Sequence, residues 1–349
     1  MITIGYTVII FVMGFFTNMN NSKEKKIYLL ICSIILILVS GLRSYYIGSG
    51  DTYRYSLMFE NDIRLTFLEI YETSERDPFY HLFSLFLSRL LGPDFHLILL
   101  AFATIYILAF DKLIYKESPN LLISYIVLFG MNFFNFSMHG VRQGLAIAFI
   151  MLAYFPLKDK KLIKFLLLVF IATCFHKSAA IFVIAYPFCR LGLNKRTIFL
   201  YLGLIGILLV TGNDLIRQFA TEVSVYDERF AGYAITEKSL SYAGIIQFSL
   251  FLILVLCNLN RFQSQDKDSS ILITLLILAM IFQAFAIYIA EMFRVAMYFS
   301  IFLVLLVPRL LKTFPQNSRK TVTLIVCSLL LLYFYSIPYK LEYNFYWNN

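Results

Sequence analysis

The chain has 349 residues, of which 60% are hydrophobic, 17% aromatic and 15% charged, with a formal net charge of +9. Soluble domains carry about 25% charged residues, so this composition argues against an ordinary soluble enzyme, a disordered chain or a nucleic-acid-binding protein. The basic residues lie in small groups between long apolar runs, as in polytopic membrane proteins. The five cysteines lie inside apolar runs and form no Cys-x-x-Cys pair, so neither a disulfide framework nor a thiolate metal site is predicted.

Apolar runs that are long enough to cross a bilayer as helices recur along the whole sequence. We expect an all-α, polytopic integral membrane protein with about twelve spans in one membrane domain, residues 1–349. The first run has no basic leading segment and no small-residue cleavage site, so we expect a retained span rather than a signal peptide. The predicted spans are residues 2–19, 27–42, 94–112, 120–137, 139–157, 161–176, 178–194, 197–213, 241–260, 270–290, 292–311 and 320–337.

The distribution of basic residues predicts the orientation. If the loop with Lys23, Lys25 and Lys26 is cytoplasmic, the alternating loops that follow are cytoplasmic too, and they are short and basic. This agrees with the positive-inside rule. Both termini are then external. The cytoplasmic loops so predicted also hold Lys112, Lys116, Lys158, Lys160, Lys161, Lys164, Arg190, Lys195, Arg196, Arg261, Lys267, Arg309, Lys312, Arg319 and Lys320.

Two long segments are predicted on the external side, residues 43–77 and 213–240. Both mix acidic, basic and aromatic residues, and loops of this length are usually functional or disordered. Their aromatic content argues against disorder. The short apolar stretch 78–91, which contains His81 and Arg89, suits an interfacial or re-entrant helix. Any chemistry is therefore expected on the external face.

Ionisable residues near the external ends of spans are the candidate site residues, because they are costly to bury in lipid. The second span ends at Arg43, and a glycine-bearing turn at residues 48–50 then presents Asp51 and Arg54. Arg54 lies between Tyr53 and Tyr55. An alternative interpretation of Arg43 is an ordinary interfacial arginine followed by a turn.

A second group lies in one predicted helix. His139, Arg142 and Gln143 have i, i+3 and i+4 spacing, so they share one helical face. A guanidinium on this face needs an anion, and its planar fork of donors suits a pyrophosphate. The alternative is a buried arginine–carboxylate pair that holds two helices together.

Two further groups follow. His176 and Lys177 lie between two apolar runs, where the histidine is either a general base, an anion ligand when protonated, or part of an ordinary helical hairpin. Glu291 and Arg294 lie one turn apart and either neutralise each other or point Arg294 into an external cavity.

Several signatures are absent from the sequence: a Gly-x-x-x-x-Gly-Lys-Ser/Thr phosphate loop, His-Glu-x-x-His and Gly-x-Ser-x-Gly. The Asp266–Asp268 pair falls in a predicted cytoplasmic turn and is interpreted as solvated charge. Glu75 and Asp77 are predicted on the external side, where they remain candidate metal ligands.

In their order along the chain, these groups resemble the EpsG-like group of Wzy-type bacterial polysaccharide polymerases. Each motif is short, and the resemblance runs from about residue 40 to 300. The usual glycine–threonine pair before the aspartate is replaced here by Gly48-Ser-Gly50. The matching residues are Arg43, Gly48, Asp51 and Tyr55; Asp77-Pro78-Phe79; Arg142, Gln143 and Ala146; Phe175, His176 and Ser178; and Arg294, Tyr298 and Phe299.

The resemblance implies a polymerase that joins undecaprenyl-pyrophosphate-linked oligosaccharide repeat units on the external face of the bacterial cytoplasmic (inner) membrane. The growing glycan is transferred to the non-reducing end of a new lipid-linked unit, without a nucleotide sugar, cofactor or metal. It also implies a fold like that of the large polyprenyl-dependent (GT-C-like) glycosyltransferases. Partners would be lipid-linked oligosaccharides, membrane lipid and, as further candidates, a chain-length regulator and other assembly proteins, with no nucleic acid.

For such a reaction we expect cations at the pyrophosphate and a general base at the acceptor hydroxyl. The expected pyrophosphate-binding residues are Arg142 first, then Arg43, Arg294 and Lys177. The base candidates are Asp51, His139 and His176, in that order. Further substrate contacts are expected from Arg54, Gln143, Tyr53, Tyr55 and Glu291.

Three rival functions remain open from the sequence. A lipid-linked oligosaccharide flippase would also be basic and polytopic, but it should show related halves and polar residues through the bilayer midplane. A metal-dependent glycosyltransferase using a polyprenyl-phosphate sugar would use Glu75 and Asp77 as ligands. A membrane acyltransferase would meet its acyl donor from the cytoplasmic side.

Overall fold

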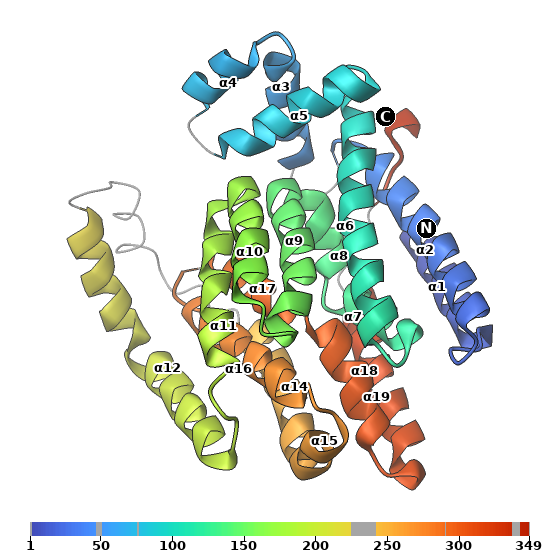
Figure 1. The fold of residues 1–349 in the computed structure, drawn as a ribbon, viewed down its shortest axis with the longest axis vertical. Coiled ribbons are helices and arrows are strands. Elements are labelled where there is room, and N and C mark those ends of the chain that lie inside the picture. The colour runs from blue at the N-terminus through green and yellow to red at the C-terminus, as the bar shows by residue number, and fades with distance from the viewer. Residues whose placement is uncertain are drawn as a thin grey trace. The chain divides into compact units, whose positions relative to one another are not determined.

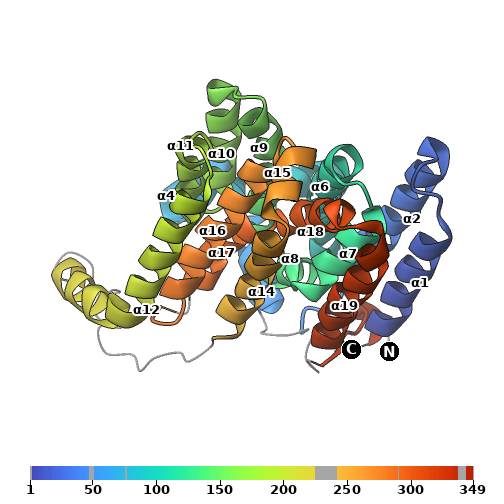
Figure 2. The ribbon, with the colours of Figure 1, turned by 90° about the horizontal axis from the view of Figure 1, so that it is seen from below.

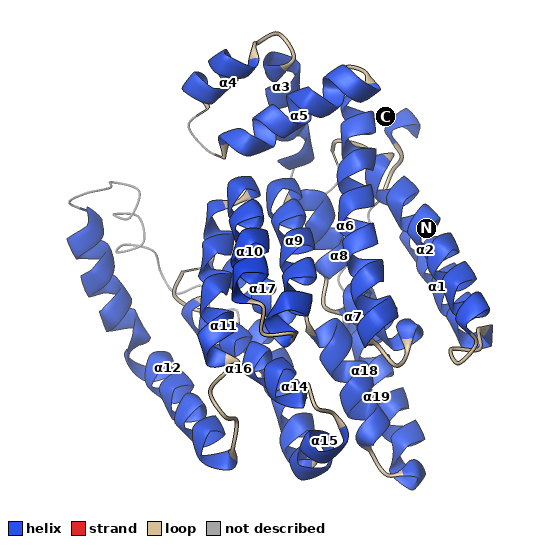
Figure 3. Cartoon of the chain, in the orientation of Figure 1, coloured by secondary structure: helices blue, strands red, loops and turns tan. Residues whose placement is uncertain are grey.

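The computed structural model describes residues 2–46, 51–74, 77–224, 242–289, 291–336 and 343–348, without the side chains of residues 195, 212–224 and 348. All regular elements in these ranges are helices, as predicted (Figure 3). The chain divides into two compact units, and each is described by itself. Unit 1 comprises residues 1–180 and 307–349, and unit 2 comprises residues 181–306.

Unit 1 is built around a hairpin of two helices, α9 and α10, with α6 packed against α9 and α2 packed against α6 (Figure 1). Side chains of asparagine or aspartate at Asn21, Asp94 and Asn120 accept hydrogen bonds from backbone N–H groups at the starts of α2, α6 and α7. The helices are α1 (Ile2–Phe16), α2 (Ser22–Gly41), α3 (Asp51–Asp62), α4 (Phe67–Thr73), α5 (Pro78–Leu91), α6 (Phe95–Glu117), α7 (Leu121–Gly130), α8 (Phe133–His139), α9 (Val141–Lys158), α10 (Leu162–Phe175), α18 (Leu303–Thr313, from Val307 onward), α19 (Gln316–Tyr335) and η4 (Tyr346–Asn348).

One end of unit 1 gathers basic side chains from several loops. Glu117, at the end of α6, pairs with Lys158 at the end of α9 and with Arg309 on α18. Lys25 donates to the Tyr115 carbonyl at 3.3 Å, which brings the start of α2 to the same end. We call this the basic end.

The opposite end of the α9–α10 hairpin lies beside the three short helices α3, α4 and α5 (Figure 1). The bounds of α5 coincide with the stretch 78–91 that is predicted as an interfacial or re-entrant helix. His81 on α5 contacts Asp62 on α3 at 2.7 Å, and Phe79 packs edge-on against Phe175 of α10. These contacts fix the short helices over the hairpin end.

The C-terminal segment of unit 1 pairs with the residues that follow α2. Ser44 N donates to Asn344 O at 2.8 Å, and Tyr346 N donates to Leu42 O at 3.1 Å. At the other side of the unit, α7 lies beside α1 and α19 (Figure 2).

Unit 2 has α16 as its central helix, against which α11, α12, α14 and α17 pack. Tyr288, after α16, donates to the Leu209 carbonyl on α12 at 2.7 Å. Helix α12 continues to Ser224, well into the predicted external segment 213–240, whose remaining residues fall outside the described ranges. The helices are η1 (Lys177–Ile184, from Ile181 onward), α11 (Ala185–Phe188), α12 (Lys195–Ser224), α14 (Ala243–Cys257), α15 (Leu259–Gln265), α16 (Ser269–Phe285) and α17 (Met292–Ser300).

Among the described residues, three helices are long and apolar enough to cross a membrane: α6, α9 and α19. Three bent pairs, α7–α8, α14–α15 and α17–α18, raise the number to six if each pair forms one span. The 54° bend between α7 and α8 falls at Asn132, whose φ is +63°. The chain is therefore an integral membrane protein, and the count of twelve spans stays a prediction.

Candidate functional site

Arg142 lies in the first turn of α9, directly after the break at Gly140 that separates α8 from α9. Its guanidinium donates through Nε to Tyr55 Oη and through Nη1 to Asp77 Oδ2, both at 3.3 Å. The side chain is 18% exposed, and its Nη2 makes no hydrogen bond to any described residue. Arg142 is thus held on two sides and open on a third.

Asp77 precedes α5 in a left-handed conformation, with φ +49° and ψ +55°. Few residues adopt this conformation, and a following proline disfavours helical backbone further, so the geometry is strained. At this position an aspartate usually caps its own helix, but the Asp77 side chain makes no such bond. It contacts Arg142 and His176 instead.

His176 is the C-cap residue that directly follows α10, and its Nδ1 lies 3.4 Å from Asp77 Oδ2. Its side chain is 25% exposed. Burial raises the pKa of Asp77, but the hydrogen bond and charge of His176, the charge of Arg142 and the backbone N–H of Lys177 outweigh this effect. The net pKa of Asp77 lies below its ordinary value, so the carboxylate is ionised at neutral pH.

Two tyrosines form the wall of this site. The Arg142 guanidinium carbon lies 5.4 Å from the ring centre of Tyr55 and 5.9 Å from that of Tyr80, within the range of cation–π contacts. Burial raises the pKa of Tyr80, which is 2% exposed, and its hydroxyl has no partner among the described residues. We call Tyr55, Asp77, Tyr80, Arg142 and His176 the Arg142 cluster; all five belong to unit 1.

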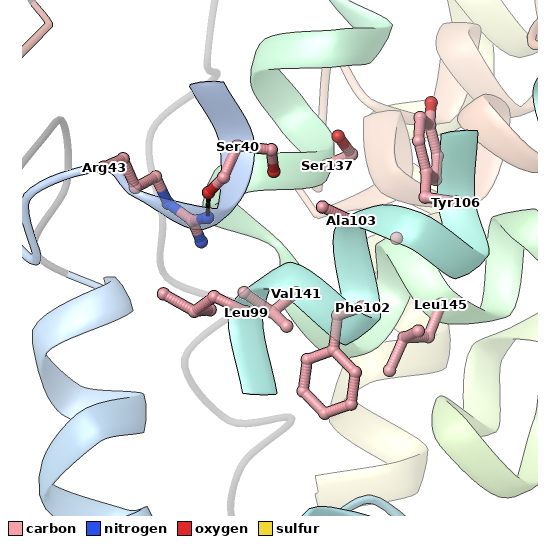
Figure 4. Close-up of a pocket in the computed structure, with 10 residues that line it drawn as sticks. Ser40, Arg43, Leu99, Phe102, Ala103, Tyr106, Ser137, Val141 and Leu145 are labelled. Carbon is pink, nitrogen blue, oxygen red and sulfur yellow. Dashed lines mark hydrogen bonds between the residues drawn. The ribbon is translucent and has the colours of Figure 1, made fainter. Parts of the chain in front are cut away.

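Arg43, also predicted to bind pyrophosphate, is 1% exposed, and its guanidinium donates hydrogen bonds mainly to backbone carbonyls. Its guanidinium donates to the carbonyl of Ser40 (Figure 4). It also donates to the carbonyl of Met138 at 2.6 Å and to the Thr52 hydroxyl at 3.5 Å. It lines a cavity of about 10 Å³, roughly the space of one water molecule. A diphosphate does not fit there, so this arrangement holds α2, α3 and α8 together.

The remaining predicted residues of unit 1 lie around these two arginines. Asp51 begins α3. His139 ends α8, so the break at Gly140 interrupts the helical face that it was predicted to share with Arg142 and Gln143, and its Nδ1 has no partner among the described residues. Tyr53 is 38% exposed and stacks on Tyr46 at 5.1 Å. Arg54 and Lys177 are exposed, and Gln143 is buried.

Arg294 and Glu291 are exposed residues at the start of α17, in unit 2. Unit 2 does not include the residues of the Arg142 cluster, which belong to unit 1. Their predicted roles in substrate binding stay predictions.

Glu75, one of the two candidate metal ligands, lies outside the described ranges, as does the turn at residues 48–50. Within the described ranges, no group of three histidine, cysteine or acidic side chains is arranged to hold a metal ion.

Asp77 and Tyr80 were not singled out by the sequence as partners of Arg142. A signal for Asp77 was present, because a buried arginine requires an anion and Asp77 opens a helix in the acidic external segment. No sequence signal identified Tyr80, since an aromatic residue in an apolar helix is ordinarily part of the core.

The Arg142 cluster combines a cation whose Nη2 makes no hydrogen bond to the described residues, a histidine that contacts a carboxylate, and aromatic surfaces. Such a set can bind an oxyanion and accept a proton within one site. A model of the EpsG family matches residues 26–348, nearly the whole chain, and includes all five cluster residues. Comparisons with curated proteins and with solved structures gave no match.

Proposed function

The chain belongs to the EpsG family, and on that premise we propose that it is a Wzy-type glycosyltransferase that polymerises undecaprenyl-pyrophosphate-linked oligosaccharides. A growing glycan is transferred from its pyrophosphate carrier to the non-reducing end of a new lipid-linked unit. The reaction uses no nucleotide and no metal. The observation that carries the proposal is the partly exposed Arg142, which is held by Tyr55 and Asp77 next to His176.

We place the enzyme in the bacterial cytoplasmic membrane with twelve spans, both termini external and the Arg142 cluster on the external face. In the part of the chain that the structure describes, three long helices, three bent pairs, five shorter apolar helices and α2 together make twelve segments, and each overlaps a predicted span. Arg142 lies in the first turn of α9 and Lys158 is its last residue, so the cluster and the basic end lie at opposite ends of one membrane helix. Positive residues favour the cytoplasmic side, which supports an external site in a fold of GT-C type.

Arg142 binds the pyrophosphate of the donor in this proposal. Its contact with Asp77 measures 3.3 Å, whereas charged N–H···O pairs usually measure 2.7–2.9 Å. The ion pair is therefore long, and a pyrophosphate oxygen can approach Nη2, which makes no hydrogen bond to the described residues, without breaking a tight ion pair. Fixed positive charge at this point stabilises the negative charge that develops on the leaving group. Lys177, exposed beside His176, supplies a second cation.

His176 is the general base in this proposal. Asp77 contacts its Nδ1 and so favours the tautomer in which Nε2 accepts a proton. The acceptor hydroxyl gives its proton to Nε2 as its oxygen bonds to the anomeric carbon. The bond from that carbon to the pyrophosphate oxygen breaks, and the electron pair leaves with undecaprenyl pyrophosphate. Asp51 and His139 are the alternative bases.

Exposed aromatic side chains near the cluster bind sugar rings. Tyr53 and Tyr46 form an exposed stacked pair on and next to α3, and Tyr55 on the same helix contacts Arg142 directly. Arg54, exposed on α3, adds a hydrogen-bond donor for hydroxyl or carboxyl groups of the glycan. Membrane lipid, a chain-length regulator and other assembly proteins are the further partners that we propose.

Reconstitution with lipid-linked repeat units tests the proposal. The wild-type protein should produce a ladder of longer glycans that persists in the presence of a chelator. Arg142→Ala should lower elongation by about 100-fold or more, since removal of one charge-stabilising donor costs 10²–10³ in rate. Arg89→Ala, which removes an exposed arginine from α5, is the matched control and should retain the ladder.

Three results would contradict the proposal. Normal elongation by Arg142→Ala would remove the anion site. Loss of the ladder with chelator would favour the metal-dependent transferase. Translocation of the lipid-linked unit without elongation would favour a flippase.

A further inference from the structure

An open groove of about 600 Å³ lies at the basic end of unit 1, between α7, α18 and α19. Figure 2 shows these three helices side by side. The groove also includes Asn120, which lies three residues after Glu117, the carboxylate that pairs with Arg309 at the basic end. It is therefore at the opposite end of α9 from the Arg142 cluster and forms no part of the proposed active site.

Three cations line the groove: Lys312 on α18, and Arg319 and Lys320 in the first turns of α19. All three are exposed, and no carboxylate lines the groove. Arg319 donates through Nε and Nη2 to the Phe314 carbonyl at 3.2 and 3.0 Å, which fixes the guanidinium in place. Neither lysine has an ion-pair partner in the described ranges. The groove thus carries positive charge without internal compensation.

The rest of the groove is mainly apolar. Ile123 and Ile126 form the side contributed by α7, and Leu324 and Cys327 form the side contributed by α19. These residues continue away from the cations, along a helix that is long and apolar enough to cross the membrane. On α19, Leu324 is 68% exposed and Leu332 is 66% exposed. The groove therefore changes from cationic to apolar along the direction of a membrane span.

This arrangement matches an amphiphile with a phosphate at one end and hydrocarbon at the other. Basic pockets between membrane helices on the cytoplasmic side are typical sites for anionic lipid headgroups. A free phosphate ion would leave the apolar walls and most of the volume unfilled. We propose that the groove between α7, α18 and α19 is a binding site for an anionic phospholipid, with the phosphate at Lys312, Arg319 and Lys320 and an acyl chain along Ile126 and Leu324.

Lipid-dependent thermal unfolding of the purified full chain in neutral detergent tests this site. Phosphatidylglycerol should raise the midpoint of unfolding, because a ligand that binds only the folded state stabilises it. Phosphatidylcholine and inorganic phosphate should not. The readout involves no glycan, so it is independent of the proposed polymerase activity.

Two variants separate a specific site from general charge attraction. The triple variant Lys312→Gln, Arg319→Gln, Lys320→Gln should weaken phosphatidylglycerol binding on the order of 100-fold, since each basic residue near an anionic surface contributes a factor of about five. Thr323→Trp keeps all three cations, fills the groove and should also abolish the stabilisation. Unfolding in phosphatidylcholine reports whether each variant is folded.

The matched control removes three exposed charges elsewhere at the basic end: Lys23→Gln, Lys26→Gln and Lys164→Gln. This variant should respond to phosphatidylglycerol as the wild type does. The proposal is overturned if both triple variants lose the response equally, if folded Thr323→Trp responds normally, or if inorganic phosphate stabilises as well as the lipid.

Discussion

Helix α9 carries a basic residue at each end. Each of these two residues contacts a carboxylate that also contacts a second basic side chain. At the basic end, Glu117 binds Lys158 and Arg309, and Arg309 Nε also donates to the Glu117 carbonyl at 2.8 Å. At the other end, Asp77 binds Arg142 and His176 at 3.3 and 3.4 Å. The two sites have similar composition and different geometry.

The difference separates a structural ion pair from a site that can bind a ligand. Arg309 is 10% exposed and has its charge matched by short contacts. Arg142 and His176 are more exposed, their contacts with Asp77 are long, and Asp77 itself has strained backbone. Loose pairs and backbone strain at a partly open position are typical of functional sites. The following variants test this distinction.

The largest effect is expected from His176→Gln, which removes the proposed base. General-base catalysis contributes 10²–10⁴ in rate, so kcat should fall about 1,000-fold with little change in thermal stability. The measurement is the initial rate of glycan elongation. His81→Gln is the matched control, because His81 forms a histidine–aspartate pair with Asp62 at 2.7 Å in the same unit. A normal kcat in His176→Gln would leave Asp51 and His139 as the base candidates.

A large loss of stability is expected from Arg309→Ala at the basic end. Removing one partner of a buried ion pair leaves a buried charge and costs about 3 kcal/mol. Chemical unfolding in detergent should show this loss, while the protein that remains folded elongates glycans normally. Arg261→Ala, an exposed arginine on α15, is the control. Unchanged stability in Arg309→Ala would remove the contrast between the two ends.

The sequence predicts the helical fold and the bounds of α5 because apolar periodicity and length are local signals. It does not predict the bend at Asn132, because the run from 120 to 137 is uninterrupted and the left-handed backbone depends on tertiary packing. Helices α3 and α4 replace the long loop that the sequence predicts over residues 43–77, and at the start of α4 Thr66 and Glu69 form a capping box whose spacing is visible in the sequence.

Arg142 and His176 were predictable as candidate site residues because each is ionisable at the edge of an apolar run. Their meeting at Asp77 was not, because it joins residues that are 65 and 99 positions apart in sequence. Arg43 has the same local signal as Arg142, but backbone carbonyls surround it. Only tertiary structure distinguishes an arginine that satisfies carbonyls from one that is open to a ligand.

A moderate, pH-dependent loss of folding stability is expected from Asp77→Asn. The pKa of Asp77 lies below its ordinary value in the folded protein, so its contribution to stability is present above the unfolded pKa of about 3.9 and is lost as the pH falls through the folded pKa. The free energy of unfolding of the wild-type protein should exceed that of Asp77→Asn by about 1 kcal/mol at pH 7. Thermal unfolding across a pH series should show this difference vanish in acid. A difference that is constant with pH would mean that the ionised carboxylate is not the stabilising group.

The smallest effect is expected at the helix ends that flank the turn between α9 and α10, where Lys158 has an ion-pair partner and Lys164 has none among the described residues. Lys158 contacts Glu117, so Lys158→Gln should cost about 1 kcal/mol. Lys164 is exposed, and Lys164→Gln should change stability by less than about 0.5 kcal/mol and leave elongation unchanged. Folding stability is measured by chemical unfolding in detergent, and elongation is measured by the glycan ladder. Because this turn lies at the far end of α9 from Arg142, an inactive Lys164→Gln variant would contradict the assignment of the active site to the opposite membrane face.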